Sequence, residues 1–538
     1  MESWFQYRRL RREAEEDLAN SQAKLGRSGT SSPSLGSDQE AGVAKKPAVF
    51  DDVPLVPGVE VSRSGDNGEI VFVVGWREND PSNPLNWSLL RKWMVMMCCC
   101  LVAIAMTVPS SVEGATQDAF DAHFGVNAMA GSMTTGIFLI GIGVGSLFAG
   151  PFSETFGRNM VYFTALIFVI LFVMAKALAP NYGAALVFRF LCALFAAAPM
   201  TVSGGTVGDI WQPLQIPFGL PLVTIAAYSG PILGPVIGAY TPQIGYVWAD
   251  WISMIITAVA LVVVLLGQPE TFSPVLLEWR AKHLRELTGD SRYRAAHAST
   301  SANSLGPRLL TNVSRPFVMI WTEPIILIFS FYLVLLYFVL FTFLNGYPFI
   351  FANVYGISTS LTFVIFVAMI PGVIVALAMI PLLYSMTKKA ARQAEADGRA
   401  LQPEVSLYWA MAGASIMMPV SLFWMAWTCY ADISIWSPIV ASGVFGWALV
   451  CIFTTTYMYI IFVYLQYAAS ALGFMTFARY VVAGALSPAS VKMYENIGPH
   501  WSVTIVAVLA TLMAPVPYVL YKYGHKVRAM SKNAANKA

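Results

Sequence analysis

Long apolar runs separated by short polar breaks fill the chain from about residue 92 to residue 521. Each run is long enough to cross about 30 Å of hydrocarbon as a helix that rises about 1.5 Å per residue. Inside a membrane, only helices and closed barrels satisfy every backbone polar group. The pattern therefore predicts an all-α membrane protein with about twelve spans, at about 92–112, 128–150, 159–179, 183–206, 216–240, 248–267, 317–342, 358–383, 405–427, 436–464, 467–487 and 501–521.

A long basic connection after the sixth span divides the predicted helices into two sets of six. Before the first span lies a polar segment with a Ser/Gly-rich stretch at 28–37, which is typical of a flexible tail. We expect five regions: a mostly disordered cytosolic tail at 1–90, an N-terminal six-helix bundle at 91–267, a cytosolic central loop at 268–316, a C-terminal six-helix bundle at 317–522 and a cytosolic tail at 523–538.

Basic residues in the connections predict the orientation, because Lys and Arg are retained on the cytosolic side of a membrane. The N-terminal segment, the connections that contain Arg158 and Lys388, and the chain end with Lys526 all fall on one side. The other side holds little beyond Lys176 and Lys492. We expect both termini in the cytosol and a position in the plasma membrane, with the vacuolar membrane as the alternative.

The composition agrees with a membrane protein, since 57% of the 538 residues are hydrophobic and 12% are charged, about half the charged share of a soluble protein. The net charge of +3 gives no support to a nucleic-acid partner. The six cysteines form no disulfide pattern, and the five histidines lie in connections or near helix ends, so we expect no metal and no cofactor. The sequence also lacks a Gly-x-x-x-x-Gly-Lys-Ser/Thr phosphate loop, which argues against an ATP-driven pump.

The polar break between the second and third spans carries the only charges for about twenty residues on either side. It runs from Gly150 to Asn159, and we expect it to form a tight turn at a membrane face. Its pattern, Gly-x-x-x-acid-x-x-Gly-Arg, resembles the loop that major facilitator transporters place between their second and third helices.

Further motifs follow in the same order as in that family. They are Arg189 in the fourth span, Gly204 to Trp211 at its end, Gly230 to Gly238 in the fifth, Pro269 to Thr271 after the sixth, and Tyr467 to Arg479 in the eleventh. From about Trp76 to Arg528 the chain resembles the fungal twelve-span drug:proton antiporter family of the major facilitator superfamily. The resemblance implies two pseudo-symmetric six-helix halves, a substrate site between them, and alternating access.

The resemblance also implies an inner gate, because the family folds the second loop against the cytosolic end of the fourth helix. An arginine fork makes bidentate hydrogen bonds with carboxylates that hold only while the two surfaces are closed. The expected cluster comprises Gly150, Glu154, Gly157, Arg158 and Asp209. The alternative is that Glu154 and Arg158 only fix the topology and solubilise the turn.

Charged residues in or near the spans are candidates for coupling transport to protons. Arg189 and Arg479 lie inside spans, where a cation costs about 2.5–3.5 kcal/mol and needs a polar partner. The resemblance implies a role for Arg189 in proton coupling, and snorkelling to the outer headgroups is the alternative. No Asp or Glu lies deep inside a predicted span, so Glu113 and Glu323, near span ends, are the candidate proton carriers.

A Gly-Pro run in the fifth span would allow close packing and bending, because glycines let helices approach and each proline removes a backbone hydrogen bond. Its members are Gly230, Pro231, Gly234, Pro235 and Gly238. The family's antiporters carry this motif, so the resemblance favours export over uptake, with helix packing alone as the alternative. The chain departs from the family pattern at Asn159 and within 215–221 and 248–251. These departures leave undecided whether the family's standard proton relay is present.

Aromatic residues crowd the seventh and tenth spans, and Tyr332 and Tyr337 are the first candidates for the substrate pathway. The sequence thus predicts a monomeric secondary transporter, not an enzyme, whose partners are its substrate, protons and the lipid bilayer. We expect export of a small hydrophobic or amphipathic compound, such as a drug, toxin or secondary metabolite, in exchange for protons. The alternative is a facilitator or symporter of an organic acid or polyamine.

Overall fold

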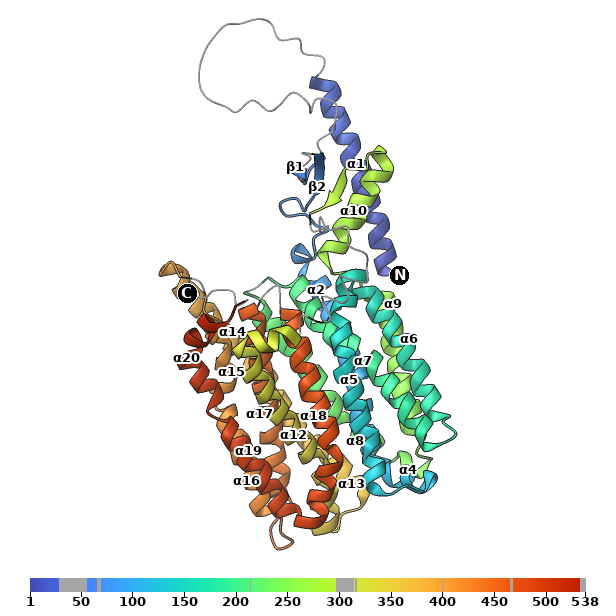
Figure 1. Ribbon diagram of the computed structural model, residues 1–538, viewed down its shortest axis with the longest axis vertical. Coiled ribbons are helices and arrows are strands. Elements are labelled where there is room, and N and C mark those ends of the chain that lie inside the picture. Colours follow the sequence, from blue (N-terminus) through green and yellow to red (C-terminus); the bar gives the residue numbers. More distant parts are fainter. Residues whose placement is uncertain are drawn as a thin grey trace, which may run out of the picture. The chain divides into compact units, whose positions relative to one another are not determined.

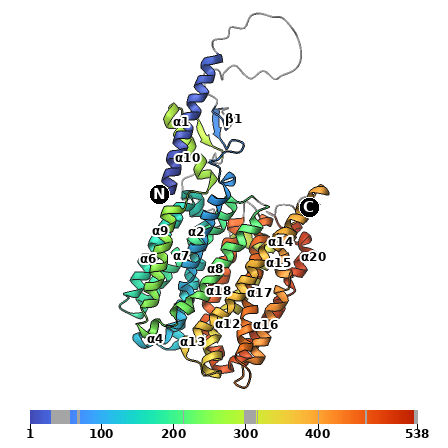
Figure 2. The ribbon, with the colours of Figure 1, turned by 180° about the vertical axis from the view of Figure 1, so that it is seen from behind.

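The computed structural model describes residues 1–28, 56–64, 69–212, 214–296, 314, 317–399, 401–464 and 468–532. This described part contains 12 helices that are long and apolar enough to cross a membrane. They cover Leu89–Ala115, Ala128–Phe156, Arg158–Ala177, Tyr182–Ile210, Ile216–Gln243, Trp248–Gly267, Pro324–Val354, Thr359–Ala396, Pro403–Thr428, Trp436–Tyr464, Ser470–Ile497 and Pro499–Met530. The expected twelve-span, all-α fold is confirmed (Figures 1 and 2).

Four of the spans are interrupted helices. The first contains α2 (Leu89–Thr107) and α3 (Pro109–Val112), the eighth α13 (Thr359–Val364) and α14 (Ile370–Ala396), the ninth α15 (Tyr408–Met411) and α16 (Ala414–Thr428), and the twelfth α19 (Pro499–Met513) and α20 (Val516–Met530). Pro109 shows the cause, because a proline without an N–H interrupts the ladder of backbone hydrogen bonds.

The remaining spans are built on single long helices. These are α5 (Ala128–Phe156), α6 (Arg158–Ala177), α7 (Tyr182–Ile210), α8 (Ile216–Gly238), α9 (Trp248–Gly267), α12 (Pro324–Tyr347), α17 (Trp436–Tyr464) and α18 (Ala468–Ile497). A short helix, α4 (Gln117–Phe124), joins the first two spans.

The chain divides by its internal contacts into two compact units. We call them the polar unit, Met1–Ser88 with Pro269–Ala302, and the membrane unit, Leu89–Gln268 with Asn303–Ala538. In the membrane unit, α5 packs against α7 of the first six-helix half and α18 of the second (Figure 1). A Cβ on Gly145 would overlap a carbonyl oxygen of α7, and a Cβ on Gly136 would lie 2.6 Å from the carbonyl oxygen of Gly484 on α18. The glycines of α5 therefore permit close packing on both sides.

The polar unit is a small α/β fold. It contains α1 (Glu2–Ser28), α10 (Ser273–Thr288) and a sheet of order β1-β2-β3, formed by β1 (Val59–Ser64), β2 (Glu69–Val74) and β3 (Tyr293–Ala295). β1 pairs with β2 in antiparallel orientation, and β2 pairs with β3 in parallel orientation. Its core comprises Ala14, Leu18, Val56, Phe72, Val74, Ala281, Leu284 and Tyr293. The expectation of a mostly disordered tail at 1–90 and a loop at 268–316 is therefore wrong for the described residues of these segments, which form helices and strands.

One sequence pattern and one long-range strand pairing explain this fold. Leu10, Ala14 and Leu18 recur every four residues on α1 and are all buried, as on one face of a helix. β3 completes the sheet from a segment more than two hundred positions away, since Phe72 pairs with Tyr293. The polar unit thus combines the segment before the first span with the connection after the sixth.

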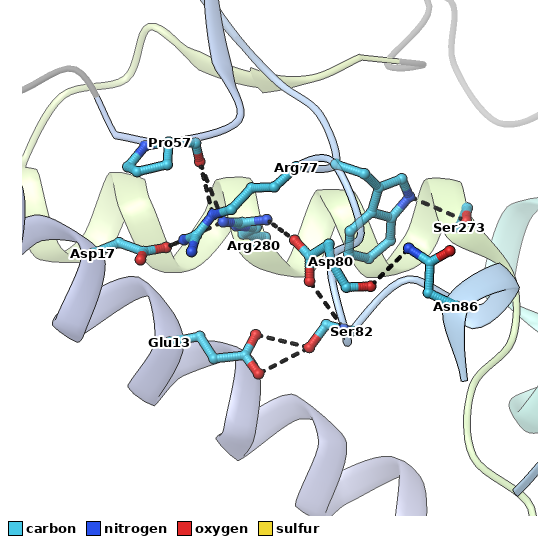
Figure 3. A network of polar contacts seen from close by, with 10 residues as sticks. Glu13, Asp17, Pro57, Arg77, Asp80, Ser82, Asn86, Ser273 and Arg280 are labelled. Atoms are coloured by element: carbon cyan, nitrogen blue, oxygen red, sulfur yellow. Dashed lines mark hydrogen bonds and ion pairs between the residues drawn. The ribbon is translucent and has the colours of Figure 1, made fainter. Parts of the chain in front are cut away.

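A buried ion cluster joins the segments of the polar unit (Figure 3). Arg280 of α10 places one guanidinium nitrogen 3.1 Å from Asp17 of α1 and another 3.0 Å from Asp80, which precedes the first span. Arg77 also pairs with Asp17. Burial and the nearby Arg280 charge lower the pKa of Arg77, whereas Asp80 opposes this shift. The cluster thus ties α1, α10 and the segment before Leu89 together.

His283 is buried in this unit. Its ring lies 4.3 Å from the ring of Tyr7 on α1, and its side chain is 1% exposed. Burial lowers the pKa of His283, and Arg11 and Lys282 lower it further, whereas the Glu286 carboxylate, 3.9 Å away, raises it. His283 therefore favours the neutral form in the folded unit.

Some predicted boundaries need correction. The polar break expected at 150–159 is not a turn over its whole length, because α5 continues through Pro151 to Phe156 and only Gly157, with a φ of 90°, separates it from α6. The region expected as a tail at 523–538 is helical as far as Met530. Residues 29–37 of the Ser/Gly-rich stretch and the break expected near 465–467 lie outside the described residues.

Candidate functional site

Arg158 and Asp209 form an ion pair at one end of the first half. Arg158 is the first residue of α6, and its Nε lies 3.0 Å from Asp209 Oδ2 near the end of α7. Its Nη1 donates to the hydroxyl of Ser153, 2.5 Å away, on the last turns of α5. A Cβ on Gly205 would lie 3.0 Å from the guanidinium carbon of Arg158, so the glycine makes room for the arginine against α7. The pair therefore fastens the α5–α6 turn to α7.

The other expected members of this cluster are placed differently. Gly157 has the positive φ that the turn needs, a backbone conformation that residues other than glycine rarely adopt. Gly150 is buried within α5, with open space where a Cβ would stand. Glu154 is exposed. Sequence reasoning missed Ser153, although its position beside Glu154 in the same motif was a usable signal.

A second cluster joins four charged side chains of the first half. Lys176 Nζ lies 2.7 Å from Glu113 Oε1 and 2.7 Å from Asp250 Oδ2, and Arg189 Nη1 lies 3.0 Å from the same Glu113 oxygen. Their side chains are only 3% to 7% exposed. We call these four residues the Lys176 network. Two cations and two carboxylates make it electrically balanced, which offsets much of the desolvation cost of each charge.

The positions of the four residues on their helices explain why their side chains come into contact. Glu113 directly follows α3, Lys176 lies in the last turn of α6, and Asp250 lies in the first turn of α9. Arg189 follows two turns into α7, donates to the Pro109 carbonyl oxygen 2.5 Å away and lies 4.2 Å from the ring centroid of Phe138. Arg189 therefore faces the inside of the bundle, and the snorkelling alternative does not describe it.

The Gly-Pro run of α8 packs directly on the first span. A Cβ on Gly230 would overlap Thr107 of α2, and a Cβ on Gly238 would lie 2.6 Å from the Val112 carbonyl oxygen. Pro235 leaves the Pro231 carbonyl oxygen without its helical partner, and the Ser111 hydroxyl donates to that oxygen at 3.0 Å. Gly234 faces the same serine. The motif thus forms a close helix contact with a side-chain hydrogen bond in place of a helical one.

In the second half, Glu323 lies at the start of α12 and is fully buried. It accepts hydrogen bonds from the Tyr464 hydroxyl at 3.2 Å and from the Lys532 backbone N–H at 3.1 Å. A buried ion pair in the same half joins Arg528 of α20 to Glu404. The sequence did not predict this pair. Glu323 is therefore at a helix end, as expected, and not at mid-span.

Arg479 of α18 is the centre of an aromatic cluster. Its guanidinium carbon lies 4.6 Å from the ring centroids of Tyr337 and Phe453, 5.0 Å from that of Tyr480 and 5.3 Å from that of Tyr457. A row of hydroxyls continues the cluster, because Tyr228 donates to Tyr337 at 3.1 Å and Tyr337 to Tyr480 at 3.4 Å.

Tyr228 belongs to α8 of the first half, whereas the other rings belong to α12, α17 and α18 of the second. The Arg479 cluster therefore lies where the two halves meet. Tyr337 takes part in it. Tyr332 is buried elsewhere on α12, beside Phe329, and is not among the rings around Arg479.

Comparisons with known proteins agree with this architecture. A family model described as Major Facilitator Superfamily matches residues 93–488. The MFS-type transporter kojT of Aspergillus flavus is 43% identical over 89% of this chain and 86% of its own length. The MFS-type transporter acdC of Aspergillus candidus is 32% identical over 84% of this chain and 89% of its own length. The solved proton:xylose symporter XylE matches 81% of this chain and 96% of its own with a TM-score of 0.58 at 13% identity, a likeness of fold.

Proposed function

The chain belongs to the major facilitator superfamily of membrane transporters, and from this premise we propose that it exports a small amphipathic compound by alternating access, in exchange for protons. The observation that carries the proposal is the polar centre between the two halves. Arg479 stands near the middle of a membrane-spanning helix, and hydroxyls from both halves surround it. Buried polar groups at mid-membrane between two repeats are the usual setting of a transporter's binding site.

We assign the Arg158–Asp209 pair the role of an inner latch. It holds the α5–α6 turn against α7, and its side chains are 10% and 16% exposed, so water reaches the pair without separating it. A charge-assisted bond of this kind forms and breaks with small movements of the two helix ends. Gly150, Glu154 and Gly157 would act through the shape and solvation of the same turn.

For the coupling to protons we propose the Lys176 network. Protonation of Glu113 would remove the negative charge that Lys176 and Arg189 share, and would loosen the connection between the first, third and fourth spans. A carboxylate whose charge changes with access to the aqueous phase meets the need of a proton-coupled carrier. Glu323 is the second candidate, because its two hydrogen bonds connect α12 with the ends of α17 and α20.

We further propose that the protein works as a monomer in the plasma membrane, with both termini in the cytosol. The basic connections support this orientation. The vacuolar membrane is the alternative position.

Transport by the purified full chain in proteoliposomes with an acidic lumen tests the proposal. A panel of labelled amphipathic compounds is offered outside, with protein-free liposomes as the control for passive distribution. We expect protein-dependent accumulation of at least one compound, and its loss when a protonophore collapses the gradient. Accumulation that ignores the gradient would favour a facilitator, and no protein-dependent movement of any compound would contradict export.

A further inference from the structure

Arg479 has hydrogen-bonding capacity that the protein leaves unused. Its side chain is 3% exposed, and its Nη2 donates to the Tyr457 hydroxyl at 2.8 Å. Its Nε and Nη1 have no hydrogen-bond acceptor in the part of the chain that the structure describes. A buried donor without a partner costs about 1–3 kcal/mol, and more when it is charged. The protein therefore keeps an expensive arrangement at the centre of the bundle.

Arg189 Nε and Arg528 Nε also lack an acceptor among the described residues, but Arg189 and Arg528 differ from Arg479 in having a carboxylate partner. Arg158, Lys176, Arg189 and Arg528 each pair with a carboxylate. Around Arg479, no described carboxylate comes within the 4.0 Å of an ion pair, and its neighbours are aromatic rings and neutral hydroxyls. Arg479 thus brings an uncompensated positive charge to the place where the two halves meet.

The aromatic rings compensate only in part. A guanidinium over ring faces gains about 0.5–2 kcal/mol from each favourable contact, but this attraction acts through the flat face of the group. The N–H bonds of Nε and Nη1 lie in the plane of the guanidinium and point to different edges of it, so each can donate to an acid oxygen that approaches in that plane. What the site lacks is one flat negative group.

We propose that Arg479 binds the acidic group of the transported compound, and that this compound is a ring-bearing organic acid. A carboxylate, or an ionised acidic hydroxyl on the ring, would accept from Nε or from Nη1, while its ring packs against Tyr337, Phe453 and Tyr480. The row of hydroxyls from Tyr228 to Tyr480 supplies further donors and acceptors for oxygen substituents on that ring. This inference rests on the proposed function, because it names the cargo class of the same transporter.

The site selects by charge. A polyamine or another organic cation would meet the buried guanidinium as a like charge in a region of low dielectric, which costs several kcal/mol. A neutral amide of the same shape would keep the ring contacts but would lose the charge-assisted hydrogen bonds. The matched pair of benzoate and benzamide therefore separates the two contributions.

Binding to the purified full chain in detergent, measured by titration calorimetry, tests this inference. The probes are benzoate, salicylate and cinnamate, each compared with its amide, and acetate serves as an acid without a ring. We expect each aromatic acid to bind about tenfold or more tightly than its amide, because charge-assisted hydrogen bonds add about that much affinity. We expect acetate to bind weakly, because it has no ring to pack.

Three variants complete the test. Arg479→Gln should abolish the preference for acid over amide, and Arg479→Lys should retain part of it, since a lysine keeps the charge but not the fork. Lys492→Gln is the matched control, because Lys492 lies on the same helix with a side chain that is 52% exposed and paired with Glu495. It should leave binding unchanged. Size-exclusion profiles and melting curves show whether each variant is folded, and Arg479→Lys keeps the test valid if Arg479→Gln does not fold.

Equal binding of acids and amides, or binding of the acids by Arg479→Gln at the wild-type level, would overturn the inference. The proteoliposome experiment separates this failure from failure of the proposed function. Gradient-dependent export of neutral compounds with no effect of Arg479→Gln would leave the function standing and remove the acid site. Arg479-dependent binding of acids without any transport would leave the acid site standing and contradict the function.

Discussion

Lys176 is the residue on which the stability of the first half should depend most clearly. Replacement by methionine keeps an unbranched side chain but removes the charge between Glu113 and Asp250. Each 2.7 Å contact is worth about 6 kcal/mol of Coulomb energy at an effective dielectric constant of about 20, before desolvation is subtracted. Removal of one partner from a buried pair usually costs about 3–5 kcal/mol, because the other charge stays buried. We expect Lys176→Met to destabilise the protein by about that amount.

The cysteines provide the assay. Cys99, Cys192 and Cys451 are buried in the membrane unit and are not in disulfides, so a thiol-reactive fluorophore reports their exposure on heating. Lys176→Met should lower the melting temperature by several degrees. The double variant Lys176→Met/Asp250→Asn should recover most of the loss, because it removes one cation and one carboxylate together and leaves the Glu113–Arg189 pair.

Lys492→Met is the matched control for the loss of a lysine. Its exposed pair with Glu495 is worth about 0–1 kcal/mol, so its melting curve should match the wild type closely. The reasoning is refuted if Lys176→Met melts like the control. It is equally refuted if the double variant loses as much stability as the sum of Lys176→Met and Asp250→Asn, since additive effects mean that the two charges do not interact.

Three further predictions follow from other contacts. Arg158→Ala should still yield folded protein, with a lower melting temperature because Asp209 loses its partner, and should lower transport in proteoliposomes; transport at the wild-type rate would contradict the latch. Gly230→Ala should destabilise the protein because the new methyl group overlaps Thr107, whereas Gly204→Ala, with open space around its Cβ position, should not; melting curves of the two decide. The polar unit should keep its full stability above about pH 6.5 and lose it as the pH falls toward the lowered pKa of His283, because the unfolded chain binds the proton more readily. Faster hydrogen exchange in α10 of the full chain at acidic pH, reduced in His283→Asn, is the expected result, and equal exchange at both pH values would contradict it.

The sequence alone was sufficient to predict the membrane spans, because long local runs of apolar residues specify membrane helices. It was also sufficient for the pairing of Arg158 with Asp209, through a family resemblance. It did not predict that Lys176 and Asp250 would join Glu113 and Arg189, because the four residues belong to four different spans. The local sequence shows where each span ends. Which span ends become neighbours depends on how four helices pack together.

The polar unit was missed for a different reason. The three residues of β3 have no hydrophobic pattern of their own, and six spans separate them in the sequence from their partners in β2. Arg280 also reads as one of many basic residues in a cytosolic connection until Asp17 and Asp80 are placed beside it. Pairings over such distances leave almost no trace in a single sequence. The unused N–H groups of Arg479 could not be predicted either, because only the three-dimensional structure shows which donors have no acceptor.

The polar unit is built from two segments far apart in the sequence, and this sets an order of events during synthesis. α1, β1 and β2 leave the ribosome first, but the Gln6 side chain bonds to the backbone of Glu270, 264 positions later. At about 5–20 residues per second, these early segments wait roughly 10–50 s for α10 and β3. During that interval the first six spans enter the membrane, and the apolar face of α1 has no native partner. Completion of the polar unit therefore marks the moment at which the first half of the protein has been fully delivered.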